Sequence, residues 1–242
     1  MQCVILAGGL ATRMRPLTET IPKALIPVTG VPFIDHQLTW MAAHGVTRVV
    51  LSIGYRGDLL RDHVGDGARF GLDEVRVVDE GTALRGTAGA LRLALDQGVL
   101  DEAFLVTYGD SFLPIDFAPV WESFGASGAP ALMTVFHNAG RWDTSNVIYR
   151  DGRVELYDKR RATRPPAEFE FIDYGLLAMK RSVIATRVPA PRAPGEKADL
   201  ADLMHALSRA GELAGLEVRE RFFEIGSPSG LEDFEAWMRA RS

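Results

Sequence analysis

The sequence predicts an α/β protein whose mixed, mostly parallel sheet is covered by helices on both faces. Short apolar runs typical of buried strands alternate with stretches of helical periodicity through the first half of the chain, which is the pattern of βαβ units. An Asp-Gly pair at 151–152 separates two further apolar runs and predicts a hairpin, which adds antiparallel strands. With 242 residues and 47% hydrophobic content, the chain can build one substantial core, so we expect a single domain over 1–242.

The elements of the first half follow from their apolar patterns. A strand at 2–7 runs into a glycine turn, and a strand over 46–53 completes a β-loop-α-β unit. Between them Pro32 begins a helix that ends at Gly45 and presents one apolar face, made of Phe33, Ile34, Leu38 and Met41. The same patterns predict, in order, a short helix near 58–63, a strand near 75–79, a helix over 87–96 and a strand over 104–108.

The second half contains the hairpin and three further predicted elements. The hairpin strands span 146–149 and 154–157. Two proline-containing stretches, 161–167 and 189–195, predict exposed loops and do not divide the chain into domains. The remaining elements are a helix near 198–208, a strand near 216–224 and a last helix near 230–239.

Composition argues against several classes of protein. A net charge of −5 argues against a nucleic-acid partner, because nucleic-acid binders normally carry a basic surface. No apolar run approaches the roughly 18 residues that a membrane-spanning helix needs, so we expect no membrane partner. Cys3 is the only cysteine, and no basic-then-apolar leader precedes the first strand. We therefore expect a cytoplasmic protein without an intrachain disulfide.

A glycine turn followed by cations forms the strongest local motif. The first strand ends in Leu-Ala-Gly-Gly, arginines follow at 13 and 15, and a lysine stands in Pro-Lys-Ala-Leu-Ile-Pro at 22–27. Exposed backbone N–H groups and cationic side chains can converge there on one polyanion. The spacing differs from both common nucleotide loops, G-x-x-x-x-G-K-[ST] and G-x-G-x-x-G. The candidate phosphate-binding residues are Leu6, Ala7, Gly8, Gly9, Arg13 and Lys23.

A carboxylate follows the strand over 104–108. Asp110 comes directly after Gly109, at the carboxyl end of a strand, which is where open α/β sheets bind their ligands. Mg²⁺ prefers hard oxygen ligands and is often held by one or two carboxylates together with substrate phosphates. We therefore expect Asp110 to bind Mg²⁺; the alternative is an ordinary turn residue.

These motifs together resemble the signature of the sugar-1-phosphate nucleotidyltransferases, also called nucleotide-sugar pyrophosphorylases. The resemblance covers nearly all of the chain and includes the glycine-rich string, Gly-Thr-Ala-Gly-Ala at 86–90 and the strand-Gly-Asp motif. The short architecture is similar to that of heptose- or mannose-1-phosphate guanylyltransferases. The resemblance implies the Rossmann-like nucleotide-diphospho-sugar transferase fold and catalytic roles for Arg13, Lys23 and Asp110.

The resemblance also implies which residues contact the base and the sugar. Small residues at 86–90 allow a planar base close to the backbone, and the N–H groups of the helix start can contact oxygen acceptors. Asp79, Gly86, Thr87 and Gly109 thus join the nucleotide-binding candidates. Lys159 stands where the family has a lysine that meets the sugar phosphate. The other substrate-binding candidates are Asp110, Asn146, Asp173, Tyr174 and Gly175.

Glu224 marks a departure from the family pattern. Phe-Phe-Glu-Ile-Gly-Ser-Pro at 222–228 resembles the closing W-x-D-I-G-T-P motif, with glutamate in place of the metal-binding aspartate. Glu224 still offers two oxygens, so we expect it to be the second metal ligand. In the alternative interpretation, the segment only ends a strand before a helix that Ser227 caps.

The resemblance implies that a sugar 1-phosphate attacks the α-phosphorus of a nucleoside triphosphate and displaces pyrophosphate, with Mg²⁺ as cofactor. The attacking oxygen is already anionic, so the protein mainly positions two polyanions and neutralises their charge. We expect GTP and a heptose or hexose 1-phosphate as substrates, with UTP or CTP as alternatives, and a monomer or homodimer. The rival functions are a glycosyltransferase, which usually needs an Asp-x-Asp pair that this chain lacks, and a catalytically silent nucleotide-sugar-binding subunit.

Overall fold

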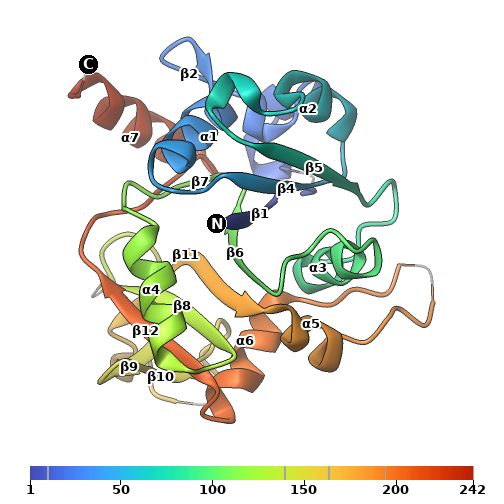
Figure 1. The fold of residues 1–242 in the computed structure, drawn as a ribbon. Helices are drawn as coiled ribbons and strands as arrows, with labels where there is room; N and C mark the ends of the chain where they lie inside the picture. The colour runs from blue at the N-terminus through green and yellow to red at the C-terminus, as the bar shows by residue number, and fades with distance from the viewer. Residues whose placement is uncertain (10, 139, 163, 194, 242) are drawn as a thin grey trace.

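The computed structural model describes residues 1–241 apart from 10, 139, 163 and 194, and within these residues nine strands form one mixed sheet (Figure 1). The strand order is β5-β4-β1-β6-β11-β8-β12-β10-β9. β1, β4, β5 and β6 run parallel to one another, and β12 runs parallel to β8. The strands are β1 (Gln2–Leu6), β4 (Arg48–Ile53), β5 (Glu74–Asp79), β6 (Ala103–Tyr108), β8 (Ala131–His137), β9 (Val147–Arg150), β10 (Arg153–Tyr157), β11 (Phe171–Lys180) and β12 (Leu213–Val218).

Helices cover both faces of the sheet, which confirms the predicted fold class. α1 (Phe33–Ala43), α2 (Gly57–Val64) and α4 (Ala118–Ser127) bury apolar residues on one face, and α3 (Thr87–Asp96), α5 (Arg181–Arg187) and α6 (Leu200–Arg209) on the other. Alternation along β1 supplies both cores, because Cys3 and Ile5 belong to the first and Val4 and Leu6 to the second. None of the helices in the described part of the chain has the length and apolar character needed to cross a membrane.

The last helix, α7 (Pro228–Arg239), packs over a small second sheet. That sheet pairs β7 (Ser111–Phe112) with β13 (Phe223–Glu224) in antiparallel fashion. Phe234 of α7 lies 4.7 Å from Phe112 and 5.7 Å from Phe223 between ring centroids, so one aromatic side chain contacts both strands. The predicted cap is confirmed, since Ser227 Oγ accepts a hydrogen bond from Gly230 N at 3.1 Å.

Short elements complete the chain. β2 (Pro27–Val28) and β3 (Val31–Pro32) form a two-stranded ribbon before α1. Single 3₁₀ turns span Thr12–Met14, Leu17–Glu19, Lys23–Leu25, Ala68–Phe70 and Pro166–Glu168.

The strand direction reverses at β11, and this reversal gathers distant segments at one edge of the sheet. Leu176 of β11 pairs with Thr107 of β6, so β11 begins beside the place where β6 ends. The first residue of β11, Phe171, pairs with His137 at the end of β8 and with Val147 at the start of β9. Val218 at the end of β12 lies beside Phe136 of β8. The segments that follow β6 and β12 and those that flank the hairpin therefore emerge at the same edge.

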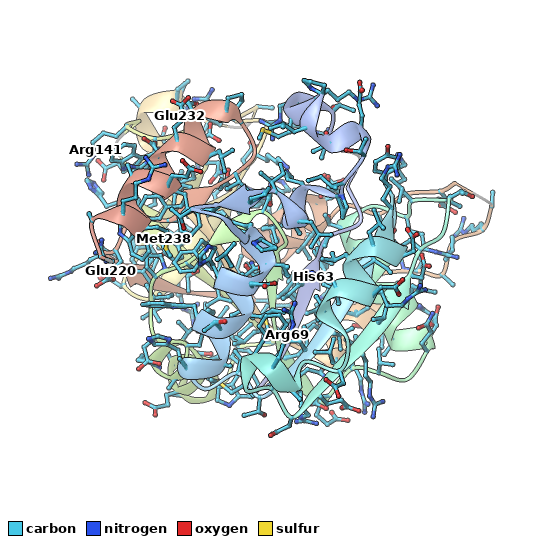
Figure 2. The ribbon with its side chains drawn as sticks, turned by 90° about the horizontal axis from the view of Figure 1, so that it is seen from above. His63, Arg69, Arg141, Glu220, Glu232 and Met238 are labelled. Carbon is cyan, nitrogen blue, oxygen red and sulfur yellow. The ribbon has the colours of Figure 1, made fainter. Side chains whose placement is uncertain are left out.

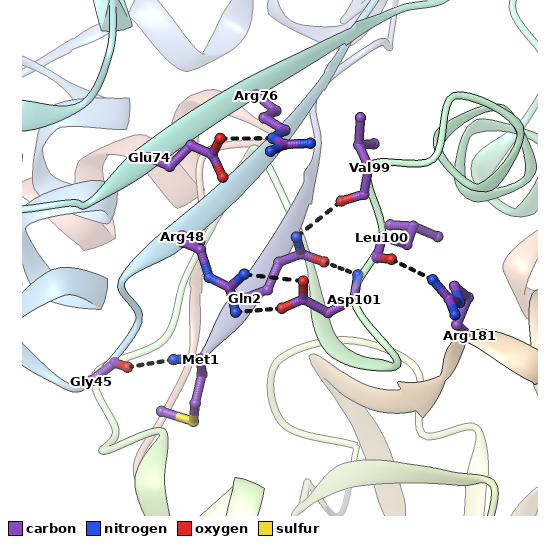
Figure 3. A network of polar contacts seen from close by, with 10 residues as sticks. All are labelled: Met1, Gln2, Gly45, Arg48, Glu74, Arg76, Val99, Leu100, Asp101 and Arg181. Carbon is purple, nitrogen blue, oxygen red and sulfur yellow. Dashed lines mark hydrogen bonds and ion pairs between the residues drawn. The ribbon is translucent and has the colours of Figure 1, made fainter.

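The opposite edge of the sheet is held by a polar network (Figure 3). Gln2 at the start of β1 donates to Val99 O at 3.0 Å and accepts from Asp101 N at 2.9 Å. Arg48 at the start of β4 binds the Asp101 carboxylate with two hydrogen bonds of 3.1 and 2.6 Å. The network joins the amino ends of β1 and β4 to the entry to β6.

Side-chain contacts also tie α1 to α2. Asp35 of α1 lies 2.6 Å from His63 Nε2 of α2, and Arg69 Nη2 lies 3.3 Å from the same carboxylate. Figure 2 shows His63 and Arg69 next to each other, and Arg69 also donates to the His63 carbonyl at 2.9 Å. These contacts join α1 to α2 and to Arg69, while Ile34, Leu38 and Met41 of α1 belong to the core.

The hairpin prediction is confirmed, because β9 and β10 are joined by Asp151 and Gly152, both with the positive φ (47° and 78°) that a tight hairpin turn uses. The prediction of one strand over 216–224 is wrong. β12 ends at Val218 and β13 begins at Phe223, since the charged run 219–221 cannot continue a buried central strand and instead carries the chain toward β7. The sequence patterns did not predict β8, β11, α4 or α5.

Candidate active site

The candidate active site lies at the carboxyl edge of β1, β4, β5 and β6, where a cleft of about 270 Å³ opens. All of the predicted nucleotide-binding residues line this cleft except Arg13 and Asp79. Asp110 lines it as well, next to Lys23. Backbone groups of the glycine turn and of the start of α3 therefore form one side of the cleft, and charged side chains close its other end.

Asp79, which the sequence analysis assigns to the nucleotide, is not part of the cleft. Its side chain is exposed, and Oδ1 accepts a hydrogen bond from Gly81 N at 2.7 Å. The adjacent Glu80 lines the cleft instead. Successive residues of an extended chain point to opposite sides, so the Asp-Glu pair alone could not show which carboxylate enters the site.

Glu80 approaches the glycine turn closely. Its Oε2 accepts a hydrogen bond from Arg85 N at 2.8 Å, and a Cβ built on Gly8 would lie 2.5 Å from Oε1. Burial raises the pKa of Glu80, and the Arg85 N–H bond opposes that rise. Sequence reasoning also missed Leu84 and Tyr108, which line the cleft. Leu84 belongs to none of the motifs, and Tyr108 is the last residue of the strand before Gly109 and Asp110, where the motif singles out only these two.

The start of α3 binds another part of the protein. Ala88 N and Gly89 N donate to the carbonyl of Ala198 at 3.0 and 3.2 Å, just before α6. The Thr87 hydroxyl donates to Asp199 at 2.9 Å and accepts from Leu200 N at 2.7 Å. The expectation that these helix N–H groups contact the ligand is therefore corrected for Ala88 and Gly89, whose donors are already used.

Lys23 and Asp110 form the charged centre of the site. Lys23 Nζ lies 2.5 Å from Asp110 Oδ2, and both side chains are partly accessible, at 19% and 24%. The backbone carbonyl of Asp110 accepts from Ile225 N at 2.9 Å. Asp110 is therefore held between the turn after β6 and the strand β13, with a cation on its carboxylate.

Arg13 and Glu224 lie beside this centre. A Cβ built on Gly226 would be 3.3 Å from Arg13 Nη2 and 3.8 Å from Asp110 Oδ2, so both side chains converge above Gly226. Glu224 pairs with Ser111 across the β7–β13 ribbon, one residue from Asp110. The structure thus brings Arg13, Lys23, Asp110 and Glu224 together from four separate segments.

The pKa of Glu224 is raised to about 7. The surrounding protein removes hydration from the carboxylate, and the negative charges of Asp110, Asp143 and Asp173 add to the effect, while Lys23 opposes it. The side chain nevertheless remains open to solvent. The negative surroundings therefore favour positive charge at the Glu224 carboxylate, either as a bound cation or as a proton on the carboxylate itself.

The predicted sugar-binding residues gather at the beginning of β11. Asn146 Oδ1 accepts from Asp173 N at 3.0 Å, and Asp173 Oδ1 accepts from Gly175 N at 3.0 Å. Burial raises the pKa of Asp173 to about 6, against the opposing effects of the Gly175 N–H bond and the positive charge of Lys159. Asn146, Asp173 and Gly175 therefore form one polar group at the carboxyl edge.

Lys159 is exposed in the turn after β10, and its ammonium acts on two carboxylates. The pKa of Asp199 is lowered: burial raises it, but hydrogen bonds from Ala201 N and Thr87 and the charges of Lys159 and Arg160 outweigh burial. The charge of Lys159 therefore acts both on Asp173 at the carboxyl edge and on Asp199 beside the start of α3.

Tyr174 does not face this group. Its side chain is 1% exposed and belongs to the core beneath α4, with its ring 5.7 Å from Phe222 and 6.4 Å from Phe136. Alternation along β11 places Asp173 at the site and Tyr174 on the opposite side. The expectation that the Tyr174 side chain contacts a sugar is therefore corrected.

Asp110 and Glu224 offer the hard oxygen ligands that Mg²⁺ prefers. No three histidine, cysteine, aspartate or glutamate side chains among the described residues are grouped so as to hold a metal by themselves. A metal ion here would need further oxygens from substrate phosphates, which is the usual situation for Mg²⁺. The donor set fits an ion that arrives with a nucleotide.

The sheet topology, with a cleft at the carboxyl edge of its parallel strands, is that of the nucleotide-diphospho-sugar transferase fold. The nucleotidyl transferase family profile matches residues 2–154 of the chain. The chain therefore belongs to the nucleotidyl transferase family, as the sequence motifs predicted. Its structure resembles HddC from Yersinia pseudotuberculosis complexed with GMP-PN, with a TM-score of 0.77 and 22% identity over 98% of this chain and 99% of that one.

Two relatives show how the similarity is distributed. The chain is 30% identical over 157 residues to a mannose-1-phosphate guanylyltransferase of Mycobacterium tuberculosis. The aligned part is 63% of this chain and 38% of that protein. It is 28% identical over 205 residues to a glucose-1-phosphate cytidylyltransferase of Salmonella typhimurium. Here the aligned part is 76% of this chain and 77% of that protein. The chain thus spans little more than a third of the mycobacterial relative.

Proposed function

We propose that this protein transfers a nucleoside monophosphate from a nucleoside triphosphate to a sugar 1-phosphate, with release of pyrophosphate. The observation that carries the proposal is the arrangement at one sheet edge of a backbone-lined cleft, the Lys23–Asp110 pair at its end and a separate polar group around Asp173. Two anionic substrates entering from the two sides would meet at Asp110.

The chemistry needs positioning and charge neutralisation more than a protein nucleophile. The phosphate oxygen of a sugar 1-phosphate is itself the attacking group, and pyrophosphate is the leaving group. Arg13 and Lys23 would stabilise negative charge on the triphosphate, and Lys159 would hold the sugar phosphate on the other side. Asp110 and Glu224 would hold Mg²⁺, which when bound lowers the repulsion between the two polyanions.

Lys23 would exchange partners during binding. Its ammonium pairs with Asp110 Oδ2 at 2.5 Å. A bound metal and triphosphate would compete for both groups, the metal for the carboxylate and the phosphates for the ammonium. Each charge of the Lys23–Asp110 pair would then be compensated by a new partner, so neither would be left unpaired.

Glu80 supports GTP as the nucleotide. Guanine presents two neighbouring donors, N1–H and the N2 amino group, and a carboxylate can accept from both. Glu80 is a carboxylate in the wall of the cleft beside Gly8. The mycobacterial relative is named a guanylyltransferase. We propose a heptose or hexose 1-phosphate as the second substrate, with UTP or CTP as the alternative nucleotides, the latter favoured by the similarity to the Salmonella enzyme.

Pyrophosphate release from a matrix of substrates tests the proposal. The purified protein is combined with each of the four triphosphates and with hexose and heptose 1-phosphates, with Mg²⁺ or with EDTA. We expect turnover with GTP and Mg²⁺, and loss of turnover in Asp110→Asn, which keeps the shape and removes the charge. A protein that binds nucleotide-sugars but releases no pyrophosphate with any pair is a silent subunit, and the proposal then fails.

A further inference from the structure

Gln37 is a buried polar residue directly beneath the turn that carries Asp110. It lies on the sheet-facing side of α1 and is 3% exposed. Its Nε2 donates to Tyr108 O at 2.9 Å and to Ser111 O at 2.7 Å. These two carbonyls enclose Gly109 and Asp110, so one amide group holds both ends of the turn.

The neighbours of Gln37 on α1 make an amide unexpected at this position. Ile34, Leu38 and Met41 are apolar and almost completely buried. Within the described residues, Gln37 Oε1 and the Ser111 hydroxyl oxygen are buried without a hydrogen-bond partner. An unpartnered buried polar atom costs free energy, and an apolar residue of similar length would avoid the cost at Oε1. What the amide provides at this position is the pair of bonds from Nε2, which an apolar residue would not give to the Tyr108 and Ser111 carbonyls.

The same turn is held from the other side by β13. Ile225 N donates to Asp110 O at 2.9 Å, and Glu224 pairs with Ser111. Ser111 thus connects the two fixed points, since its carbonyl binds Gln37 and its backbone pairs with Glu224. The relative positions of the Asp110 and Glu224 carboxylates depend on this doubly anchored segment.

We propose that Gln37 is a positioning residue that sets the Asp110 carboxylate relative to Glu224 and so determines how strongly Mg²⁺ tightens nucleotide binding. The inference rests on the proposed function, because it assigns the two carboxylates to the metal. Gln37 is not among the residues that line the cleft, and it would act through the backbone of the turn.

Calorimetry tests this role without relying on turnover. The affinity for GTP, or for whichever triphosphate the wild-type protein uses, is measured in EDTA and in saturating Mg²⁺. Gln37→Met keeps the length and removes both donors. We expect the ratio of the two dissociation constants to fall by about tenfold, with the affinity in EDTA changed less than about twofold. Because coupling between two ligands is reciprocal, the nucleotide would also tighten Mg²⁺ binding less, and the variant should need more Mg²⁺ for half-maximal rate.

Trp40→Phe is the matched control. Trp40 lies one turn further along α1 and donates from Nε1 to Ile115 O at 3.0 Å, so its substitution removes a bond of the same kind from the same helix to a later carbonyl. We expect it to leave the Mg²⁺ effect unchanged. If Gln37→Met does not fold, Gln37→Asn retains the amide but shortens its reach and carries the same test.

Three outcomes would overturn the inference: an unchanged Mg²⁺ effect in the folded Gln37 variant, an equal loss of affinity in EDTA and in Mg²⁺, or the same loss in Trp40→Phe. A wild-type protein whose nucleotide binding does not respond to Mg²⁺ would instead contradict the assignment of the carboxylates to a metal, and with it the proposed function.

Discussion

Replacement of Gly86 by alanine tests the contact between the start of α3 and the segment before α6. Gly86 has φ 77° and ψ 169°, a region that residues with a Cβ avoid. A Cβ built there would lie 2.5 Å from the Ala198 carbonyl oxygen. That oxygen is a backbone atom and accepts from Ala88 N and Gly89 N. The new methyl group must therefore displace the backbone on which the start of α3 is held.

The cost of Gly86→Ala can be worked from two contributions. The backbone conformation costs about 1 to 3 kcal/mol for a residue with a Cβ. Loss of the two bonds to Ala198 adds about 0.5 to 1.5 kcal/mol for each bond. The free energy of unfolding should therefore fall by about 2 to 6 kcal/mol, and Tm by at least about 4 °C for a chain of this size.

Gly81→Ala is the control for conformation alone. Gly81 also has a positive φ, 61°, but a Cβ built on it would meet nothing within 4 Å. Its substitution should cost about 1 to 2 kcal/mol. Urea denaturation followed by circular dichroism compares the two variants, and nucleotide affinity is measured on the folded protein. Equal losses of stability in both variants would refute the argument that Ala198 sets the cost.

Lys23→Ala should raise the KM for the triphosphate and Lys159→Ala should raise the KM for the sugar 1-phosphate, because each cation would face a different anion. Steady-state kinetics with each substrate varied in turn measures both constants. Identical behaviour of the two variants would contradict this division of roles. Glu224→Gln should remove most activity at limiting Mg²⁺ and Glu224→Asp should retain much of it, because only the first loses the charge; a near-normal rate for Glu224→Gln would leave Asp110 as the only protein ligand. Asp173 has a pKa raised from 3.8 to about 6 by burial, so its neutral form is favoured in the folded protein and its contribution to stability is lost as pH rises from about 4 to about 6. Asp173→Asn should therefore become more stable relative to wild type over that interval, by up to about 3 kcal/mol in urea denaturation, and a difference independent of pH would contradict the assignment.

Most residues that line the cleft could be predicted from the sequence because they lie in continuous motifs. The glycine turn follows directly on the first strand, and Gly86 and Thr87 open a helix, so each motif fixes its own local geometry. The Asp-Gly hairpin was predictable for the same reason. That all of these motifs reach one edge depended on the parallel order of β1, β4, β5 and β6, which the alternating pattern indicated.

The remaining parts depended on contacts between distant segments. Asp79 and Glu80 are adjacent at the end of β5. Which of the two carboxylates enters the cleft depends on the side to which each side chain points, and the sequence does not show this. Tyr174 was assigned to the sugar because it lies between Asp173 and Gly175, but its ring fills the core on the other side of β11. Gln37 carried no motif, because its two partners are backbone atoms of residues 108 and 111. The single-domain organisation and the roles of the site residues stay predictions.

Because β11 reverses the strand direction, its beginning reaches the same edge as the end of β6. The residues that would choose the base and those that would choose the sugar therefore come from separate parts of the sequence. The cleft is built from residues 6–110, and the polar group around Asp173 from residues 146–175. A chimera joined within α4 could therefore exchange sugar preference while keeping base preference. It would succeed only if residues 222–239 came from the same parent as residues 110–112, since β13 and α7 return to complete the turn at Asp110. Base preference and sugar preference would then be exchangeable separately, with residues 222–239 exchanged together with residues 110–112.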